Sequence, residues 1–150
     1  MPTTQSQTEN AIAYGFIIER TSKAIKQQFQ RMLREVQAGL TVDQWIILHE
    51  LYLEEPLSQW ELAQRTFKHP PAISRLMDSL LALDFVYRRE DERDARRHNV
   101  YLTEAGRAKV TSLLPVVQRF RESGMADVPT AELQKALDVL NRIFHHMQSL

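Results

Sequence analysis

The sequence predicts a mainly α-helical protein with one small antiparallel β-hairpin. Apolar residues recur at three- and four-residue spacing through most of the chain, which indicates amphipathic helices. The pattern changes to alternation only in residues 85–89 and 98–102, on either side of a charged segment, as in the two strands of a hairpin. A length of 150 residues is enough for one domain with a real core, and a second full domain does not fit.

A long amphipathic helix is predicted near the N-terminal end, over residues of about 10–38. Gly39 is expected to end this helix, because glycine commonly follows a last helical turn. The apolar residues of the helix are Tyr14, Ile17, Ile18, Ile25, Phe29, Met32, Leu33 and Val36.

A short helix is predicted over residues 58–65. Ser58 precedes Glu61 by three residues, a spacing at which each side chain can accept a hydrogen bond from the other's backbone amide. Residues 66–69 interrupt the helical pattern. Pro70 and Pro71 then fit the first turn of another helix, where a missing amide hydrogen does no harm and φ is already suitable.

The helix that begins at Pro70 is predicted to have one buried and one polar face. The buried face is expected to hold Ile73, Leu76, Met77, Leu80, Leu81 and Leu83. The polar face shows Ala72, Ser74, Arg75, Asp78 and Ser79. Two short helices followed by a hairpin are the element order of a winged helix-turn-helix, which predicts binding to duplex DNA.

Two parts of this unit carry the side chains that could read DNA. At the start of the second helix, Ser74 and Arg75 could donate to base edges or phosphates, and Ala72 leaves room for a thymine methyl. At the hairpin tip, residues 90–97, an aspartate two residues before an arginine could hold one side of its guanidinium while the other side reaches a narrow minor groove. The arginines of the tip are Arg93, Arg96 and Arg97. The alternatives are an ordinary solvated helix face and a tip whose opposite charges only neutralise one another.

Several motifs in order make the chain resemble the multiple-antibiotic-resistance regulator (MarR) family of bacterial and archaeal transcription factors. The motifs are Leu40 to Leu48, similar to the family's second helix, Leu57 to Ala63, Ser74 to Leu80, the wing motif Asp91 to Arg97, and Leu102 to Arg107. Asp84 stands where the family usually has a glycine to turn out of the recognition helix. Aspartate tolerates left-handed backbone better than most residues, so the same turn is expected.

The resemblance implies a DNA interface in two parts. Residues around Pro70, Ala72, Ser74 and Arg75 would contact the major groove, and Arg96 would enter the minor groove with Asp94 as its orienting partner. The predicted interface as a whole is Lys68, His69, Pro70, Ala72, Ser74, Arg75, Arg93, Asp94, Arg96 and Arg97.

The two ends of the chain, residues of about 10–38 and 103–150, are predicted to be dimerisation helices around a core of about 40–102. A helix should begin at Thr103 and bend at Pro115, and a last helix should begin near Thr130. Its apolar stripe is too wide for a domain this small to cover, so we expect a homodimer; an intramolecular cap on the core is the alternative. The stripe is formed by Leu133, Leu137, Leu140, Phe144 and Met147. Two recognition helices about 34 Å apart would read a pseudo-palindromic operator.

The resemblance also implies a repressor that is released by a small aromatic or phenolic acid. The pocket would lie between the dimerisation helices and the DNA-binding lobe, lined by Trp45 and His49, with Tyr14 or Phe29. The alternative is that these are ordinary core residues, and Trp45 and Trp60 are expected to be core.

Composition excludes several other classes of function. Nineteen basic and nineteen acidic residues give zero net charge, so only local charge can support DNA contact. The absence of cysteine excludes disulfides and a thiol switch, and the four scattered glycines offer no phosphate-binding loop or nucleophile turn, so we expect no enzyme. No run is long enough to span a membrane and residues 1–10 are unlike a secretory signal, which predicts a cytoplasmic protein.

Two other functions remain open from the sequence. One is a protein-interaction module that has lost DNA contact, which the zero net charge favours. The other is a metal-responsive regulator, although His145 and His146 are adjacent and point in different directions, and His49 lacks a second histidine at helical spacing. We expect no metal and no cofactor.

Overall fold

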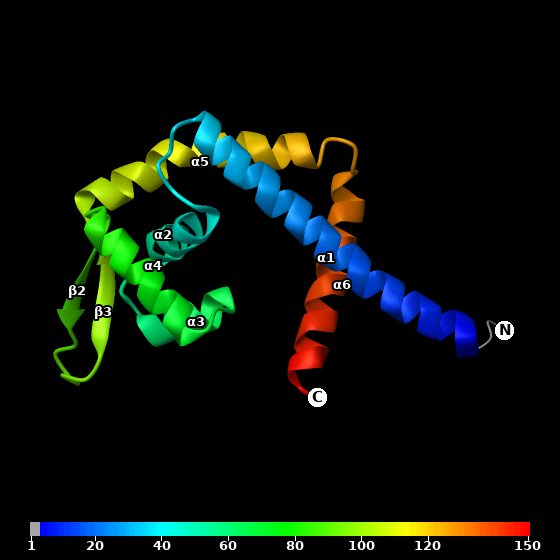
Figure 1. Cartoon of the computed structure of the whole chain (residues 1–150), viewed down its shortest axis with the longest axis horizontal. Coiled ribbons are helices and arrows are strands. Elements are labelled where there is room, and N and C mark those ends of the chain that lie inside the picture. Colours follow the sequence, from blue (N-terminus) through cyan, green and yellow to red (C-terminus); the bar gives the residue numbers. More distant parts are fainter. Residues whose placement is uncertain (1–3) are drawn as a thin grey trace. The chain divides into compact units, whose positions relative to one another are not determined.

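The computed structural model describes residues 4–150, with side chains described from residue 13 onward (Figure 1). The elements in chain order are α1 (Thr4–Glu35), α2 (Val42–Leu53), β1 (Leu57–Ser58), α3 (Gln59–Thr66), α4 (Pro70–Ala82), β2 (Val86–Glu90), β3 (His98–Leu102), α5 (Glu104–Gly124) and α6 (Thr130–Gln148). The chain divides into two compact units, Met1–Leu114 and Pro115–Leu150. The mainly helical class with a small antiparallel sheet is confirmed. The first three residues of the polar segment 1–10 lie outside the described residues.

The connection between α1 and α2 differs slightly from the prediction. The helix ends at Glu35, four residues before Gly39, because Gln37 already takes a left-handed conformation with φ of 53°. Gly39 supplies a second positive φ, of 68°, which glycine adopts without steric cost. Thr41 then caps α2 in a reciprocal pair with Gln44.

The two short helices form as predicted. Ser58 and Glu61 make the expected capping box at the start of α3, and Pro70 occupies the first position of α4. Asp84 takes φ of 57°, the left-handed turn expected after the recognition helix. Leu83 was expected on the buried face and is 41% exposed instead, because α4 ends at Ala82 and the chain turns away there.

The hairpin strands β2 and β3 pair antiparallel in the register Val86↔Leu102 and Glu90↔His98. The structure adds a strand that the sequence does not signal: β1 pairs with β3 at Leu57↔Val100, which gives the order β1-β3-β2. Two residues are too few to show an alternating pattern. This extra strand ties the start of α3 to the hairpin.

The core of the first unit is apolar and comes from all of its elements. Its fully buried members include Leu33, Ile47, Leu48, Leu51, Leu57, Leu62, Ile73, Met77, Leu80, Val86, Val100 and Val110. Trp45 is 3% exposed, so its prediction as a core residue is confirmed. The same prediction for Trp60 is wrong: it is 69% exposed, because it lies on the side of α3 opposite the fully buried Leu62.

The last helix leaves its apolar stripe in contact with solvent in the single chain. None of the residues of α6 is buried, and Leu137, Leu140 and Met147 are all exposed. Pro115 lies inside α5, where the two units divide; the bend there stays a prediction. Among the described residues no helix is long and apolar enough to cross a membrane.

Gly106 is required where α5 begins, because the chain passes against the turn that follows α4. A Cβ at this position would lie 2.9 Å from the carbonyl carbon of Phe85 and closer still to its oxygen. Thr103 fixes the same contact, since its amide donates to the Phe85 carbonyl at 3.0 Å and its hydroxyl accepts from the Gly106 amide at 3.0 Å.

Gly106→Ala is therefore expected to lower the free energy of unfolding by roughly 1–3 kcal/mol, the usual range for overpacking against atoms that cannot move. The measurement is urea denaturation followed by circular dichroism. Gly15→Ala is the control, because nothing lies within 4 Å of the new methyl in the middle of α1; it should be neutral or stabilise by up to about 1 kcal/mol. Equal effects of the two changes would contradict this account of Gly106.

Candidate nucleic-acid interface

The first two turns of α4 present the predicted major-groove residues. Ser74 and Arg75 are exposed and Ala72 is half-buried. His69 precedes the helix without a side-chain capping bond, and the Ala72 amide donates to its carbonyl at 2.9 Å. Pro70 at the first helical position removes an amide that would have no partner inside the helix. The polar residues at this helix start are thus free to meet a ligand.

The tip of the hairpin is held by hydrogen bonds to its own backbone. The Asp94 carboxylate accepts from the Arg96 amide at 3.0 Å, and the Asp91 carboxylate accepts from the Arg93 amide at 2.8 Å. The sequence predicts that such a carboxylate holds the arginine guanidinium. The structure places it on the backbone amide two residues later, the geometry in which an aspartate side chain mimics a turn.

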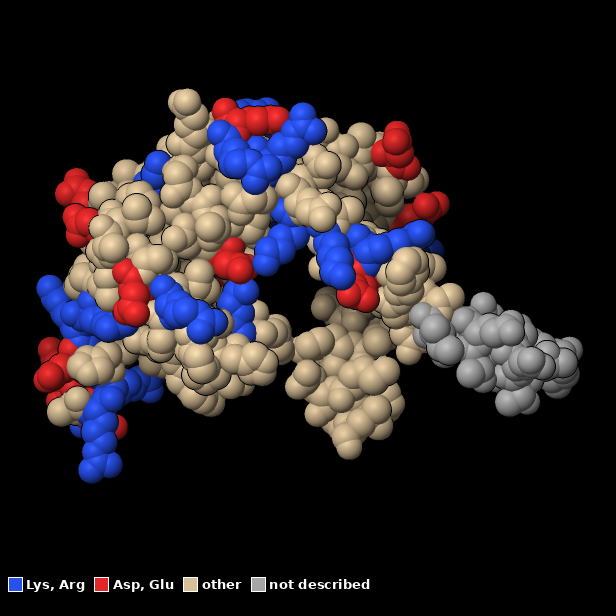
Figure 2. Space-filling view, viewed as in Figure 1, with Lys and Arg blue, Asp and Glu red and all other residues tan. Residues whose placement is uncertain are grey.

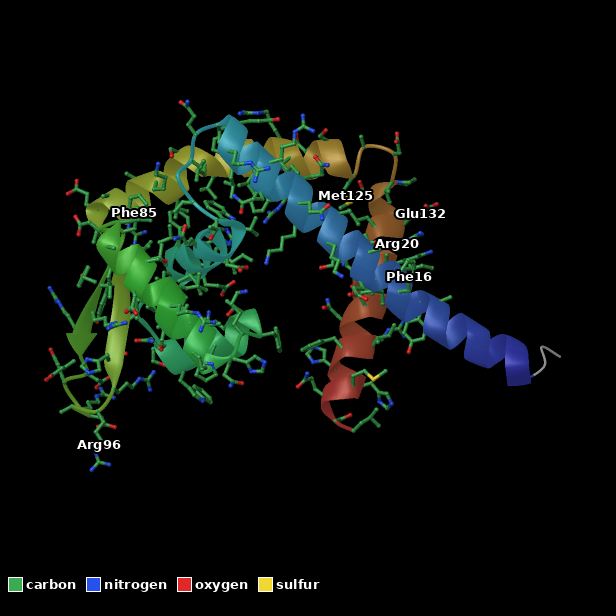
Figure 3. All side chains as sticks on the ribbon, viewed as in Figure 1. Phe16, Arg20, Phe85, Arg96, Met125 and Glu132 are labelled. Carbon is green, nitrogen blue, oxygen red and sulfur yellow. The ribbon has the colours of Figure 1, made fainter. Side chains whose placement is uncertain are left out.

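Asp91 is the firmer of the two anchors. Its other carboxylate oxygen accepts from the Asn99 side chain at 3.0 Å, which connects the tip to β3. The Arg93 amide, and next the Asn99 side chain, lower the pKa of Asp91 from its ordinary value. The Asp91 carboxylate is therefore charged at neutral pH. Arg96 points outward from the turn into solvent (Figure 3).

One carboxylate joins the wing to the helix-turn-helix. Glu61 accepts from the Ser58 amide at 2.7 Å and forms an ion pair with the Arg97 guanidinium at 2.8 Å. The Ser58 amide is the main reason that the pKa of Glu61 lies below its ordinary value; partial burial opposes the shift and Arg97 adds to it. Glu61, in the first turn of α3, thus also holds the wing through Arg97.

Most cations around this interface are neutralised by a partner within the chain. The pairs are Arg65 with Glu54 and Glu50, Lys68 with Asp43, Arg88 with Asp78, Arg97 with Glu61, and Arg107 with Glu55. Within the described residues, Arg75, Arg93 and Arg96 have no ion pair. Figure 2 shows Lys and Arg side chains standing out, among acidic ones, around the hairpin.

The predicted interface is therefore not uniform. Its unpaired arginines lie at the two places that a winged helix-turn-helix directs toward DNA, the recognition helix and the wing tip. Lys68 and Arg97 are engaged inside the chain instead, and Lys68 is only 21% exposed at its side chain. Arg89, which was not in the predicted set, lies over the ring of Tyr87 at 5.3 Å.

The predicted ligand-pocket residues come together in part. The Trp45 ring stacks on His49 at 5.4 Å and meets the edge of Phe29 at 6.4 Å. Tyr14 lies fifteen residues before Phe29 on α1, about 22 Å along the axis of a straight helix, so it does not join this cluster. Among the described residues no group of three or more His, Asp or Glu side chains could hold a metal ion.

Fold and interface together define the class of winged helix-turn-helix transcriptional regulators. Residues 38–97 match the model of the MarR family, and this match, together with the fold, supports a winged-helix transcriptional regulator of MarR type. The chain is 27% identical over 129 residues to the HTH-type transcriptional regulator SarZ of Staphylococcus aureus, which covers 85% of this chain and 82% of SarZ. These relatives are transcriptional regulators and not enzymes, as the sequence predicts.

Solved structures show the same fold. The S. aureus MepR–DNA complex has a TM-score of 0.79 at 23% identity and covers 91% of this chain and 98% of that one. A mutant MarR of E. coli in complex with operator DNA has a TM-score of 0.82 at 19% identity, covering 89% of this chain and 95% of that one.

The charge on Glu61 is expected to stabilise the fold in a pH-dependent way. Because its pKa is lowered on folding, its contribution is present above the unfolded value, about 4.3, and is lost as the pH falls through the lower folded value. Glu61→Gln should therefore destabilise at pH 7, by less than about 1 kcal/mol because the pair with Arg97 is partly exposed. The difference from the wild type, measured by urea denaturation, should disappear toward pH 3.

Glu92→Gln is the matched control, since Glu92 is exposed on the same wing and has no ion pair among the described residues. Its difference from the wild type should stay near zero throughout. A Glu61→Gln difference that is the same at pH 7 and pH 3 would show that the charge of Glu61 contributes nothing.

Proposed function

We propose that this regulator is a homodimeric repressor that binds a pseudo-palindromic DNA operator and is released by a small molecule. The observation that carries the DNA-binding part is the distribution of ion pairs. Arg75 on the recognition helix and Arg93 and Arg96 on the wing lack ion-pair partners among the described residues, as does Arg89 on β2, while Lys68, Arg88 and Arg97 have them. A neutral chain can bind a polyanion only where its positive charge is locally uncompensated.

The geometry supports a different role for each of the two parts. The exposed start of α4, with Ala72, Ser74 and Arg75, suits base edges in the major groove. Arg96 extends from a tip whose backbone is fixed by Asp94, which suits a narrow and strongly negative minor groove. His69 and Pro70 lie at the helix start, close to where phosphates would pass. MepR and the mutant MarR of E. coli, which share this fold, form complexes with DNA.

The test is fluorescence anisotropy with duplex DNA from upstream of the protein's own gene, over a range of salt, followed by random-duplex selection if that DNA does not bind. Arg75→Ala, Arg93→Ala and Arg96→Ala should each weaken specific binding by about tenfold or more. A lost phosphate contact should also reduce the slope of log affinity against log salt by about 0.9 per protomer.

Arg65→Ala is the control, because it removes a positive charge that is already paired with Glu54 at 2.7 Å. It should leave the salt dependence unchanged. If neither selected nor upstream DNA binds specifically, the protein-interaction module, favoured by the zero net charge, replaces this proposal.

The dimer is supported by apolar surface that the single chain leaves exposed. On α6 the stripe that contains Leu137, Leu140 and Met147 has no buried member, which is unfavourable for an isolated helix in water. On α1, Phe16 and Ile17 are also exposed. A second copy would cover such a stripe, and a two-fold dimer would also place two recognition helices on a pseudo-palindromic operator.

Leu137→Glu should shift the protein toward monomer, because a carboxylate would be buried without a partner at the proposed interface. Analytical ultracentrifugation at micromolar concentration measures the shift. Ala131→Glu adds the same charge on the opposite side of α6 and should leave the dimer intact. A monomeric wild type, or equal behaviour of both variants, would remove the dimer from the proposal.

Release by an aromatic acid is supported by the cluster of Phe29, Trp45 and His49, which joins α1 to α2. A ligand there could favour a dimer with wrongly spaced recognition helices only by binding that state several kcal/mol more tightly. Repression follows if the operator overlaps a promoter, since a bound dimer then blocks polymerase.

A further inference from the structure

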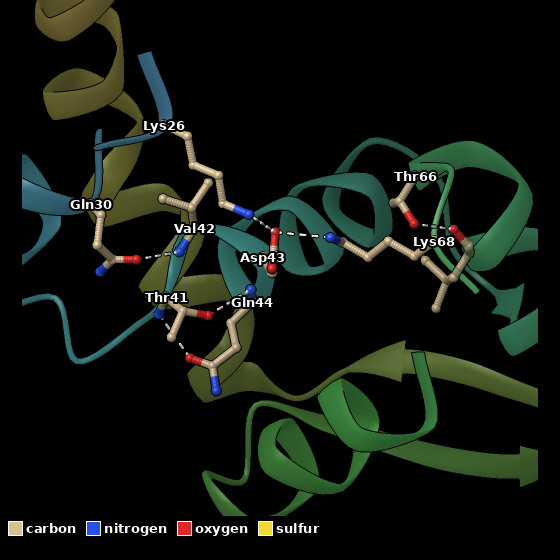
Figure 4. Close-up of polar contacts among 9 residues, drawn as sticks. Lys26, Gln30, Thr41, Val42, Asp43, Gln44, Thr66 and Lys68 are labelled. Atoms are coloured by element: carbon tan, nitrogen blue, oxygen red, sulfur yellow. Dashed lines mark hydrogen bonds and ion pairs between the residues drawn. The ribbon is translucent and has the colours of Figure 1, made fainter. Parts of the chain in front are cut away.

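The first turn of α2, residues 41–44, contacts α1 on one side and the helix-turn-helix on the other (Figure 4). Toward α1, the Gln30 side chain accepts from the Val42 amide at 2.9 Å. Toward the recognition helix, the Gln44 side chain donates to the Ser79 hydroxyl at 3.0 Å. This turn is the polar junction between the N-terminal helix and the DNA-binding elements.

Asp43 lies at the centre of the junction and pairs with two lysines. One carboxylate oxygen is 2.9 Å from the Lys68 ammonium and 3.1 Å from the Lys26 ammonium. The side chains of Asp43 and Lys68 are 31% and 21% exposed, so this pair is screened less than a surface pair. Partial burial would raise the pKa of Asp43, but the two lysines together lower it, so the carboxylate is charged at neutral pH.

Lys68 occupies the turn between α3 and α4. Its amide donates to the Ala63 carbonyl at 3.2 Å, and Phe67 before it is in the left-handed conformation with φ of 53°. That conformation is uncommon for a bulky side chain, so the surroundings must hold the turn. The Asp43 pair acts on the next residue, two positions before the recognition helix begins at Pro70.

We propose that Lys68 is an internal tether and not a phosphate contact, and that Asp43 is the positioning residue that holds the start of the recognition helix. This inference rests on the proposed DNA binding and revises the role of one predicted interface residue. If Lys68 bound a phosphate in place of Asp43, it would lose an ion pair with a half-buried carboxylate and gain one with a solvated group. The turn between α3 and α4 would then no longer be held. Asp43 would then keep only Lys26, which is 56% exposed.

The two roles of Lys68 predict opposite results for Asp43→Asn. If Lys68 is a tether, operator binding weakens by about three- to tenfold with no change in salt slope. If Lys68 is a phosphate contact restrained by Asp43, the same variant binds more tightly and with a steeper salt slope, because a cation is released. The measurement is operator affinity by anisotropy at several salt concentrations.

Lys68→Gln and the double variant complete the test. As a tether, Lys68→Gln weakens binding as much as Asp43→Asn, its salt slope stays that of the wild type, and the double variant is no worse than either single one. A slope lower by about 0.9 per protomer, or additive losses in the double variant, would overturn the proposal. Lys68→Arg keeps the ion pair and should restore wild-type affinity.

Lys23→Gln is the matched control: it removes one lysine from an exposed pair with Glu19 on α1 and should change nothing. Hydrogen exchange without DNA separates this inference from the proposed function. The amides of residues 66–69 and 72 should exchange faster in Asp43→Asn and Lys68→Gln, with the hairpin unchanged, whether or not the protein binds DNA. Unchanged exchange in that segment would reject the tether.

Discussion

The reciprocal capping between Ser58 and Glu61 is the interaction on which the DNA-binding half of the chain depends. The Glu61 carboxylate accepts a hydrogen bond from the Ser58 amide at the start of α3 and also forms an ion pair with the guanidinium of Arg97. Leu57 and Ser58 pair with β3 at the same point. The start of a helix, the edge of a sheet and the tip of the wing therefore share one carboxylate, and moving any of them leaves a backbone donor or a cation without its partner.

A chain with no net charge can present a DNA-binding surface because its charges are sorted by pairing. Several acidic residues neutralise a cation of the same chain, as Asp43 does for Lys68, and others hold the backbone, as Asp91 and Asp94 do in the wing turn. On the recognition helix and the wing the cations without an ion pair are arginines, whose planar groups can donate hydrogen bonds in two directions. The net charge of the chain does not show which cations are paired; the positions of their acidic partners do.

The sequence predicts those features that depend on neighbours within about four residues. The capping box at Ser58, the proline start of α4 and the left-handed turn at Asp84 are local, and each is confirmed. Features that depend on distant partners cannot be predicted in this way. The two-residue strand β1 has no alternating pattern of its own, and the apolar character of Trp60 does not show that its face of α3 is exposed. The sequence around Lys68 is the same whether this lysine pairs with Asp43 or with a phosphate.

Contacts at the two ends of α3 position the wing and the recognition helix. The first turn of α3 holds the wing through Glu61, and the turn after its last residue holds the start of α4 through Lys68. Eight residues of helix span about 12 Å and do not bend appreciably, so wing and recognition helix are fixed to one rigid rod. Asp43 also contacts Lys26 on α1. A displacement of α1 would therefore act on the start of the recognition helix through Asp43 and Lys68, and on the wing only through α3. In the proposed dimer, the spacing of the two recognition helices would therefore change while each helix keeps its own wing in register.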